Sequence, residues 1–323
     1  RELGEELAFK LFMQCLYQLK LKQSQATFGS HTSKSFKDSQ VFDREHHIVK
    51  IGHFFRNCDQ ALIQRYLCRT CRKSFSQETI HPCVYQKKRH LNSSVFNLLV
   101  SGVSQRRAAR LLQVNPKTIV RKFLFLGQFS LAELRNKTHL QNKHIEAMQF
   151  DDMETFEHSK CKPLSITLAV EEKTRFILGF RVASMPAKGL LAKTARAKYG
   201  YRKDERAKFR RKLFRELQNH ISTEATIKSD MNPHYKEDVR RYFQTQAYFT
   251  YKGRRGCVVG QGELKSGGFD PLFSLNHTAA MLRANINRLF RRTWCTTKKA
   301  ICLEYHIALY CFYHNFVLLP NTQ

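Results

Sequence analysis

The chain has 323 residues, and its 56 Lys and Arg against 26 Asp and Glu give a formal net charge of +30. A hydrophobic fraction of 42%, with 12% aromatic residues, is enough to form hydrophobic cores. This composition excludes a disordered chain, a collagen and a minimal disulfide scaffold. So large a positive excess is normally neutralised by a polyanion, most often nucleic acid and less often a membrane surface. The length allows two or three domains.

The sequence gives little support for a membrane partner. Its most apolar N-terminal stretch, residues 8–21, is interrupted by two lysines and two glutamines. It lacks the unbroken apolar run of a signal peptide or a spanning helix. The ten cysteines are too sparse for a secreted disulfide framework. We therefore expect a cytoplasmic protein whose cysteines are buried thiols or metal ligands.

Residues 1–40 predict a short helical extension and a polar linker, and residues 41–90 predict a small module of short strands and turns. Within this module, Cys68 and Cys71 have the spacing of one zinc knuckle. A closed structural zinc site needs four ligands. A second Cys-x-x-Cys is absent upstream, where the available ligands are His46, His47, His53 and Cys58. Either Zn²⁺ binds a zinc-ribbon-like module through mixed ligands, or the site has decayed.

Residues 91–135 predict a helix-turn-helix DNA-binding domain. No acidic residue lies between Glu78 and Glu133, whereas nine Lys and Arg do. Gly102 ends the first predicted helix, Ser104 caps the second, and Asn115 followed by Pro116 begins the third. Four residues of the second helix are expected to point inward: Ala108, Ala109, Leu111 and Leu112.

The helix-turn-helix prediction assigns DNA contacts to individual side chains. Arg106 and Arg107 are expected to meet phosphates. The next helix is expected to present four residues to the major groove: Asn115, Lys117, Thr118 and Arg121. The alternative is an ordinary helical hairpin with a solvated basic face.

From residue 143 the hydrophobic periodicity changes to that of strands. Strands are predicted at 145–150, 164–170 and 175–182, followed by a charged helical region at 194–220, a strand at 225–228, a helix after Asn232, a strand at 247–251, and helices at about 275–292 and 303–316. This order predicts an α/β fold over residues 143–320, with the mixed sheet and helices of a ribonuclease H-like domain.

Two aspartates mark the ends of predicted neighbouring strands. Asp151 follows the first strand, and Asp230 follows the fourth. Two carboxylates held close together repel each other unless a cation lies between them. A pair of Mg²⁺ ions in such a site can activate the attacking oxygen and stabilise the leaving oxygen of a phosphodiester. The alternative for either residue alone is ordinary turn chemistry.

Two further segments are strongly basic. Residues 196–215 contain ten Lys and Arg against two acids, and residues 271–303 contain no acid. Such runs are either solvated faces or tracks for DNA.

The joint order of these motifs resembles bacterial insertion-sequence transposases of the DDE type. The motifs are the knuckle at 64–76, the helix-turn-helix, Phe150-Asp151-Asp152-Met153, Ser229-Asp230-Met231-Asn232, and the segment 282–293. The resemblance covers about residues 41–316. It implies cleavage or nicking at element ends and transfer of the 3′ hydroxyl into target DNA. The expected partners are double-stranded DNA at element ends and targets and further copies of the chain, in a bacterial nucleoid-associated location.

The resemblance assigns Asp151 and Asp230 to the family's first two acids, but the third acid departs from the pattern. The family usually has Glu at the start of the helix that begins here at Leu275, and Asn276 occupies that position. Asn can ligate a metal through its amide oxygen but adds no charge. Glu263, in the preceding glycine-rich loop, is a second candidate. The alternative for Asn276 is a plain N-cap.

These observations predict a DNA transposase with Mg²⁺-dependent phosphodiester chemistry. One alternative is a non-catalytic DNA-binding protein, or a decayed transposase, that retains the fold. A third hypothesis is a ribonuclease or a binder of structured RNA.

Overall fold

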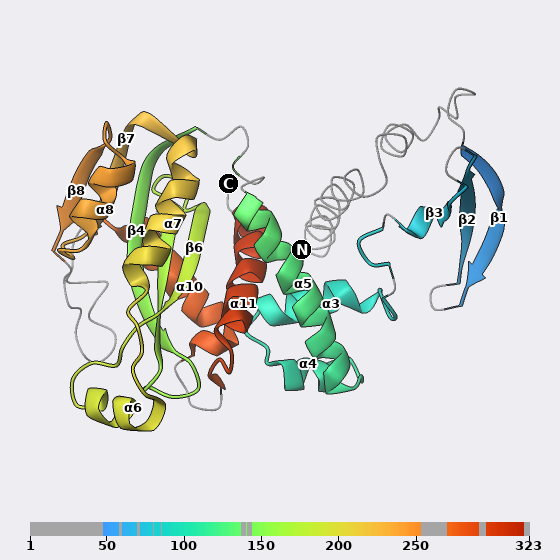
Figure 1. The fold of residues 1–323 in the computed structure, drawn as a ribbon, viewed down its shortest axis with the longest axis horizontal. Helices are drawn as coiled ribbons and strands as arrows, with labels where there is room; N and C mark the ends of the chain where they lie inside the picture. The colour runs from blue at the N-terminus through green and yellow to red at the C-terminus, as the bar shows by residue number, and fades with distance from the viewer. Residues whose placement is uncertain are drawn as a thin grey trace. The chain divides into compact units, whose positions relative to one another are not determined.

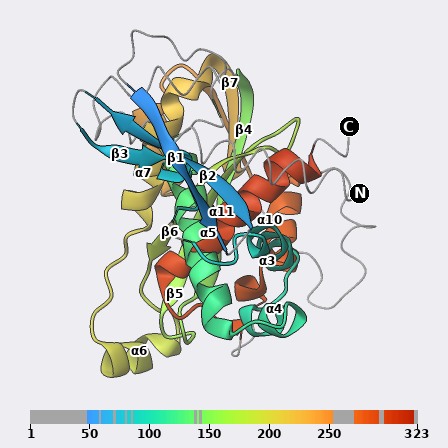
Figure 2. The same ribbon diagram turned by 90° about the vertical axis from the view of Figure 1, so that its right-hand side faces the viewer.

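The computed structural model describes residues 48–57, 60–69, 72–79, 81–84, 86–136, 140, 144–252, 270–290 and 295–319. The predictions for residues 1–40, Cys58, Cys71 and Glu263 lie outside these ranges. The chain divides into two compact units, Arg1–Val95 and Phe96–Gln323, and the described residues are mixed α/β (Figures 1 and 2).

The first unit contains a three-stranded antiparallel sheet. Its strands are β1 (Ile48–Arg56), β2 (Ala61–Cys68) and β3 (Ser74–Ser76), in the order β1-β2-β3. A short 3₁₀ turn, η1 (Gln77–Thr79), follows. Tyr66 and Phe75 stack across β2 and β3 with ring centroids 5.4 Å apart. Short strands are therefore present where the sequence predicts them.

Three helices form the predicted helical segment: α3 (Leu91–Val100), α4 (Gln105–Leu111) and α5 (Pro116–Asn136). The Ser104 hydroxyl accepts a hydrogen bond from the Arg107 N–H at 3.3 Å, and Asn115 Oδ1 accepts one from the Lys117 N–H at 2.9 Å. Both predicted caps are therefore confirmed. Gly102 has φ +76°, a conformation that suits glycine.

One inward prediction for α4 is wrong. Ala108 and Ala109 are buried, but Leu111 is 58% exposed. At 3.6 residues per turn, Leu111 lies about 110° away from the direction midway between the two alanines. The buried stripe of this short helix is therefore centred on the alanines and excludes Leu111.

A five-stranded mixed sheet forms the centre of the second unit. Its strands are β4 (Ile145–Phe156), β5 (Pro163–Glu171), β6 (Ile177–Ser184), β7 (Ile221–Asp230) and β8 (Ala247–Tyr251), in the order β6-β5-β4-β7-β8. β4, β5 and β6 are antiparallel neighbours, whereas β7 is parallel to both β4 and β8.

The first strand of this sheet is longer than the sequence predicts. β4 continues to Phe156 because residues from Asp152 onward pair with β5, although the last residue paired with β7 is Gln149. Asp151 therefore lies inside a strand and not after its end. It lies at the level where β4 loses one of its two neighbours.

Helices contact both faces of the sheet (Figure 1). α7 (Arg206–Leu217) and α8 (Tyr235–Tyr242) pack on the face of Phe150, and α10 (Phe273–Asn285) binds the opposite face through Gln149. The prediction of one helix over 275–292 is wrong. α10 ends at Asn285 because Ile286 is extended, and a 3₁₀ turn, η4 (Asn287–Leu289), follows.

The last helix joins the helical segment to the sheet. α11 (Ala300–Tyr313), continued by η6 (His314–Leu318), packs against α5 and β6. A Cβ at Gly127 of α5 would collide with Tyr305 of α11, so glycine permits this close approach. Nε2 of His306 lies 2.8 Å from the Leu99 carbonyl oxygen. Among the described helices, none combines the length and apolar character needed to span a membrane.

Candidate active site

Asp151 and Asp230 come together where β4 and β7 separate. In the parallel register Met148 is opposite Ile227, and Gln149 is opposite Lys228. The same offset brings Asp151 level with Asp230, the last residue of β7. The sequence therefore indicates the correct neighbouring strands, and the register explains why two residues 79 positions apart meet.

The two carboxylates are poorly neutralised by the protein. Burial, followed by repulsion from the nearby Asp230 carboxylate, raises the pKa of Asp151 from 3.8 to about 7. Burial also raises the pKa of Asp230, with a contribution from Asp152. In the part of the chain that the structure describes, no Lys or Arg forms an ion pair with Asp151 or Asp230. These two adjacent carboxylates therefore have no cationic partner among the described residues, in a chain of net charge +30.

A buried tyrosine fixes the Asp151 carboxylate. The Tyr235 hydroxyl donates to Asp151 Oδ1 at 3.1 Å and accepts from the Asp152 N–H at 3.1 Å. The Asp152 N–H also donates to Asp151 Oδ1 at 2.6 Å. Burial, followed by repulsion from Asp152, raises the pKa of the Tyr235 phenol, which therefore remains a donor. Tyr235 cannot be predicted as a site residue from the sequence, because its only local signal is a place in the first turn of a predicted helix.

The neighbouring residue, Asp152, belongs to a different network. It accepts hydrogen bonds from Thr167 and from Arg210, whose Nη1 lies 3.3 Å from Asp152 Oδ2. Nε of the same guanidinium donates to Asp238 Oδ2 at 2.8 Å, and the Arg210 guanidinium carbon lies 4.7 Å from the centre of the Tyr235 ring. Arg211 also pairs with Asp238, so two arginines balance the two acids on one side of β4.

This network changes the interpretation of the basic run at 196–215. Arg210 is buried between acids, Arg206 pairs with Asp204, and Arg202 pairs with Glu157. These arginines therefore have protein partners. The exposed cations of the run are Arg196, Lys198, Lys203, Lys208, Lys212 and Arg215.

The start of α10 is attached to the strand that carries Asp151. Gln149 Oε1 accepts from the Leu275 N–H at 3.0 Å, and its Nε2 donates to the Pro271 carbonyl at 3.0 Å. Gln149 and Asp151 are two positions apart in β4 and so share a face. The first turn of α10 therefore contacts the face of β4 to which Asp151 belongs.

Asn276 lies in this first turn but is not the N-cap, which is Leu272. Its side chain is exposed, and its Nδ2 donates to Asp270 Oδ2 at 2.8 Å. Its Oδ1 is the atom that would ligate a metal. The capping alternative for Asn276 is therefore wrong.

The donors at the pair suit a hard cation, although the described set is incomplete. Mg²⁺ is commonly held by one or two carboxylates, with waters and substrate phosphates completing its ligands. Asp151 and Asp230 provide such carboxylates. Within the described ranges, no group of three or more Asp, Glu, His and Cys side chains is arranged to hold a metal.

A polar hollow opens beside Asp230. It has a volume of about 580 Å³ and is lined by Lys188, Arg206, Asp230, Met231, Asn232, Pro233 and His234. Lys188 also pairs with Glu154 at 3.2 Å. An anionic group entering this hollow would meet Lys and Arg side chains beside the unpaired acid.

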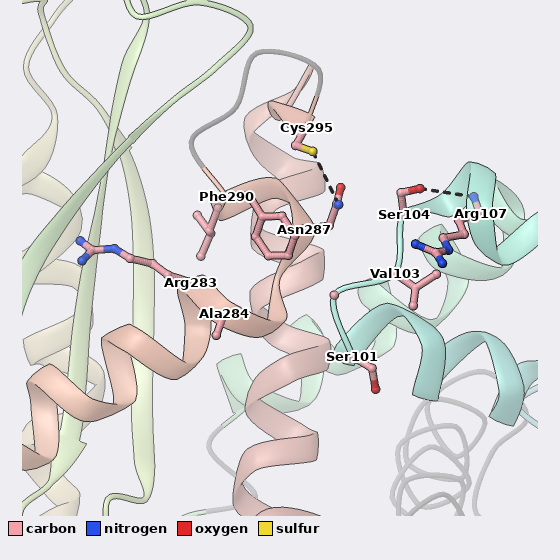
Figure 3. A pocket seen from close by; sticks show the side chains of 11 residues that line it. Ser101, Val103, Ser104, Arg107, Arg283, Ala284, Asn287, Phe290 and Cys295 are labelled. Atoms are coloured by element: carbon pink, nitrogen blue, oxygen red, sulfur yellow. Dashed lines mark hydrogen bonds between the residues drawn. The ribbon is translucent and has the colours of Figure 1, made fainter. Parts of the chain in front are cut away.

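The residues predicted to contact DNA lie on an accessible surface. Arg106 and Arg107 of α4, and Asn115, Lys117 and Arg121 at the start of α5, are exposed, and Thr118 is half-buried. Arg107 also lines a hollow of about 910 Å³. Figure 3 shows Ser104 and Arg107 on one side of this hollow, and Asn287 and Phe290 on the other.

The possible zinc knuckle is described only at its first cysteine. Cys68 is the last residue of β2 and is buried. Its N–H donates to the Lys73 carbonyl at 3.0 Å.

Comparison with known proteins gives no match to a family model or to a curated protein. The geometry and electrostatics of the chain are therefore the basis on which its function is inferred.

Proposed function

We propose that the chain is a DNA transposase of the DDE type, in which Asp151 and Asp230 form the centre that cleaves and joins phosphodiester bonds. One observation carries the proposal. Two adjacent carboxylates lack a Lys or Arg ion-pair partner among the described residues, although the whole chain has a net charge of +30. A cation that bridges them removes their mutual repulsion.

The sheet supports a ribonuclease H-like domain. Numbered along this sheet, the strand order is 3-2-1-4-5, with the first three strands antiparallel and the last two parallel to the first. This topology makes the first and fourth strands neighbours, which the prediction from the acids requires. A fold alone does not define a reaction, so the acids carry more weight.

The chain's own residues prepare the centre in three ways. Tyr235 orients one oxygen of Asp151, and Arg210 forms an ion pair with the neighbouring Asp152. Lys188 and Arg206 line the hollow next to Asp230, where they can attract a phosphate group. When Mg²⁺ is bound by the two aspartates, it supplies polarisation of the phosphodiester and a more acidic attacking hydroxyl.

The helical segment supports recognition of DNA by the same unit. Its exposed cations lie on α4 and α5, and α5 is packed against α11, which contacts β6. Binding of element ends by α4 and α5 would therefore take place on a part of the molecule packed with the catalytic sheet. We include the first unit as a zinc-ribbon-like module, supported by the position of Cys68 at the end of β2.

The direct test uses the full chain and a plasmid that carries its gene with the native flanking sequence. Asp151→Asn and Asp230→Asn should each reduce Mg²⁺-dependent cleavage and joining by about 100-fold or more, since removing a group that stabilises transition-state charge commonly costs this much. Binding to the same DNA should persist.

Two matched controls remove an exposed carboxylate from the same strands. Glu146→Gln lies on β4 and Glu224→Gln lies on β7, and both positions are exposed. Each should cleave like the unaltered chain. Full cleavage by Asp151→Asn would overturn the proposal.

A second candidate function is a non-catalytic DNA-binding protein that keeps the fold. The observation that favours it is that no third Asp, Glu, His or Cys joins the pair within the described residues. It predicts DNA binding without Mg²⁺-dependent cleavage by the intact chain.

A further inference from the structure

The segment between β6 and α7 forms an arm. We define the α6 arm as residues 185–203, which include α6 (Leu191–Tyr199). Its base is closed by hydrogen bonds between Ser184 and Glu205, one of them from the Glu205 N–H to the Ser184 carbonyl at 3.0 Å. Figures 1 and 2 both show α6 set apart from the five-stranded sheet.

The α6 arm is uniformly basic. It contains no Asp or Glu, and its six cations are Lys188, Lys193, Arg196, Lys198, Arg202 and Lys203. Lys188 and Arg202 pair with acids outside the arm. No described acid forms an ion pair with Lys193, Arg196 or Lys203. Within the described ranges, these three cations are therefore not neutralised by an acidic side chain.

The same arm exposes apolar and aromatic groups. Leu190 is 98% exposed and Tyr201 is 80% exposed. Groups of this kind, placed among Lys and Arg, are typical of surfaces that contact the sugars and bases of nucleic acids. Exposed apolar surface with a basic surround therefore favours a DNA duplex over an uncharged protein surface.

A hollow lies at the inner side of the arm. Its volume is about 740 Å³, and Lys193, Arg196, Tyr199 and Arg202 are among its lining residues. Nζ of Lys162 lies 4.7 Å from the centre of the Tyr199 ring and belongs to the same lining. Cations and aromatic rings therefore line one concave surface.

The arm begins beside the acid pair. Lys188 belongs to the arm and lines the same hollow as Asp230. A duplex positioned at Asp230 would therefore meet the arm along its flanking sequence.

We propose that the α6 arm binds duplex DNA next to the site of cleavage, with its unpaired cations on phosphates and with Leu190 and Tyr201 in a groove. The proximity of this duplex to the cleaved bond rests on the proposed function, whereas the binding itself does not. The commitment to DNA follows from charge complementarity, because the arm has six cations and no acid.

The experiment measures binding of the full chain to a fluorescent duplex in the absence of divalent metal. A duplex of about 40 bp is long enough to extend beyond the contacts of a single DNA-binding module. Lys193→Gln with Arg196→Gln should weaken binding by about tenfold at 0.1 M salt. The slope of log K against log salt should fall by about 0.9 for each lost phosphate contact. The matched control, Lys236→Gln with Arg240→Gln, removes one exposed Lys and one exposed Arg from α8 and should change binding by less than about threefold.

Leu190→Ser with Tyr201→Ser tests the apolar contacts separately. This variant should also bind more weakly, by about tenfold, but with an unchanged salt slope, because no phosphate contact is lost. The footprint on DNA should shorten on the side that flanks the cleavage site.

The outcomes separate this inference from the proposed function. If both arm variants bind and footprint like the control while the unaltered chain cleaves DNA, the arm proposal is wrong and the enzymatic proposal stands. If the arm variants lose binding while the unaltered chain never cleaves DNA, the arm proposal stands without the transposase. Loss of binding to anionic phospholipid vesicles, with unchanged binding to the duplex, would also overturn it.

Discussion

Two sets of aspartates each have one member on β4, and they differ in how their charge is balanced. Asp152 and Asp238 share the guanidinium of Arg210. Asp151 and Asp230 face each other without such a partner among the described residues. Burial alone does not distinguish these sets, since Asp238 is only 1% exposed. The two sets differ instead in the balance of charge, which distinguishes a structural ion-pair network from a candidate metal site.

The missing cationic partner of Asp151 and Asp230 lowers the stability of the metal-free chain. Arg210 and Arg211 pair with Asp152 and Asp238 within the native fold, so this set has cationic partners supplied by the chain itself. Asp151 is instead held with a pKa of about 7, which disfavours its charged form near neutral pH. A site that destabilises the apoprotein in this way is typical of function.

The largest effect on stability should come from breaking the balanced set. Arg210→Met leaves Asp152 without its cation and Asp238 with Arg211 alone, and should lower the free energy of unfolding by about 3–5 kcal/mol. Chemical denaturation at pH 7 measures this change. Arg215→Met, an exposed cation on the same helix, is the control and should change stability by less than about 0.5 kcal/mol. Equal losses in both variants would remove the distinction between buried and exposed cations of α7.

The second effect has the opposite sign and concerns the unbalanced set. Between about pH 4 and pH 7 the native chain holds a proton on Asp151 that the unfolded chain has lost, so the free energy of unfolding falls as pH rises through this window. Asp151→Asn removes that penalty. The pKa shift corresponds to about 4 kcal/mol, and screening by solvent at this half-buried pair should leave a stabilisation of about 2 kcal/mol for the metal-free chain at pH 8. The gain should vanish near pH 4.

Thermal unfolding at several pH values measures this gain. An increase of about 5 °C in Tm is expected at pH 8 for a unit of this size. A lower Tm for Asp151→Asn at pH 8 would show that the carboxylate is compensated in the native state.

A smaller effect is expected for Tyr235→Phe, which removes one donor from Asp151 and keeps the ring packed on Phe150. Loss of this hydrogen bond should destabilise the ionised carboxylate by about 1 kcal/mol and so raise the pKa of Asp151 further. The pH dependence of metal binding should therefore shift upward. An unchanged pH profile would show that Tyr235 has no part in positioning Asp151.

The weakest effect should be that of a single exposed arginine on α4. Arg106→Ala should reduce DNA affinity by a factor of about 5 and lower the salt slope by about 1, since one phosphate contact is lost. The double variant Arg106→Ala with Arg107→Ala should show about twice this change in slope. Unchanged slopes would show that these arginines of α4 make no phosphate contacts and lie on a solvated face.

Much of the fold follows from local patterns in the sequence. Ser104 and Asn115 cap helices where capping chemistry predicts it, and the strands of the mixed sheet occur at the expected periodicity. Asp151 and Asp230 could be chosen because acids are scarce and these two occur on strands that become neighbours. Boundaries were less predictable, as in β4, which continues to Phe156 by pairing with β5.

The supporting residues could not be found from the sequence, because their roles depend on distant partners. Arg210 is one of ten cations in a run, and only the fold places it between Asp152 and Asp238. Tyr235 has no local feature that distinguishes it from other buried aromatic residues. Asn276 lies in a helix that the sequence predicts, but only the structure shows that its side chain donates a hydrogen bond to Asp270.

The most direct test of the metal site is a measurement of Mn²⁺ binding to the full chain at pH 8, with Mg²⁺ as competitor. Electron paramagnetic resonance detects the bound Mn²⁺. The unaltered chain and the Glu146→Gln control should bind Mn²⁺ and release it to Mg²⁺. Asp151→Asn and Asp230→Asn should each weaken binding by about tenfold or more, since each removes a ligand and a charge. Equal Mn²⁺ affinity in the unaltered chain and in both aspartate variants would contradict the assignment of this pair as a metal site.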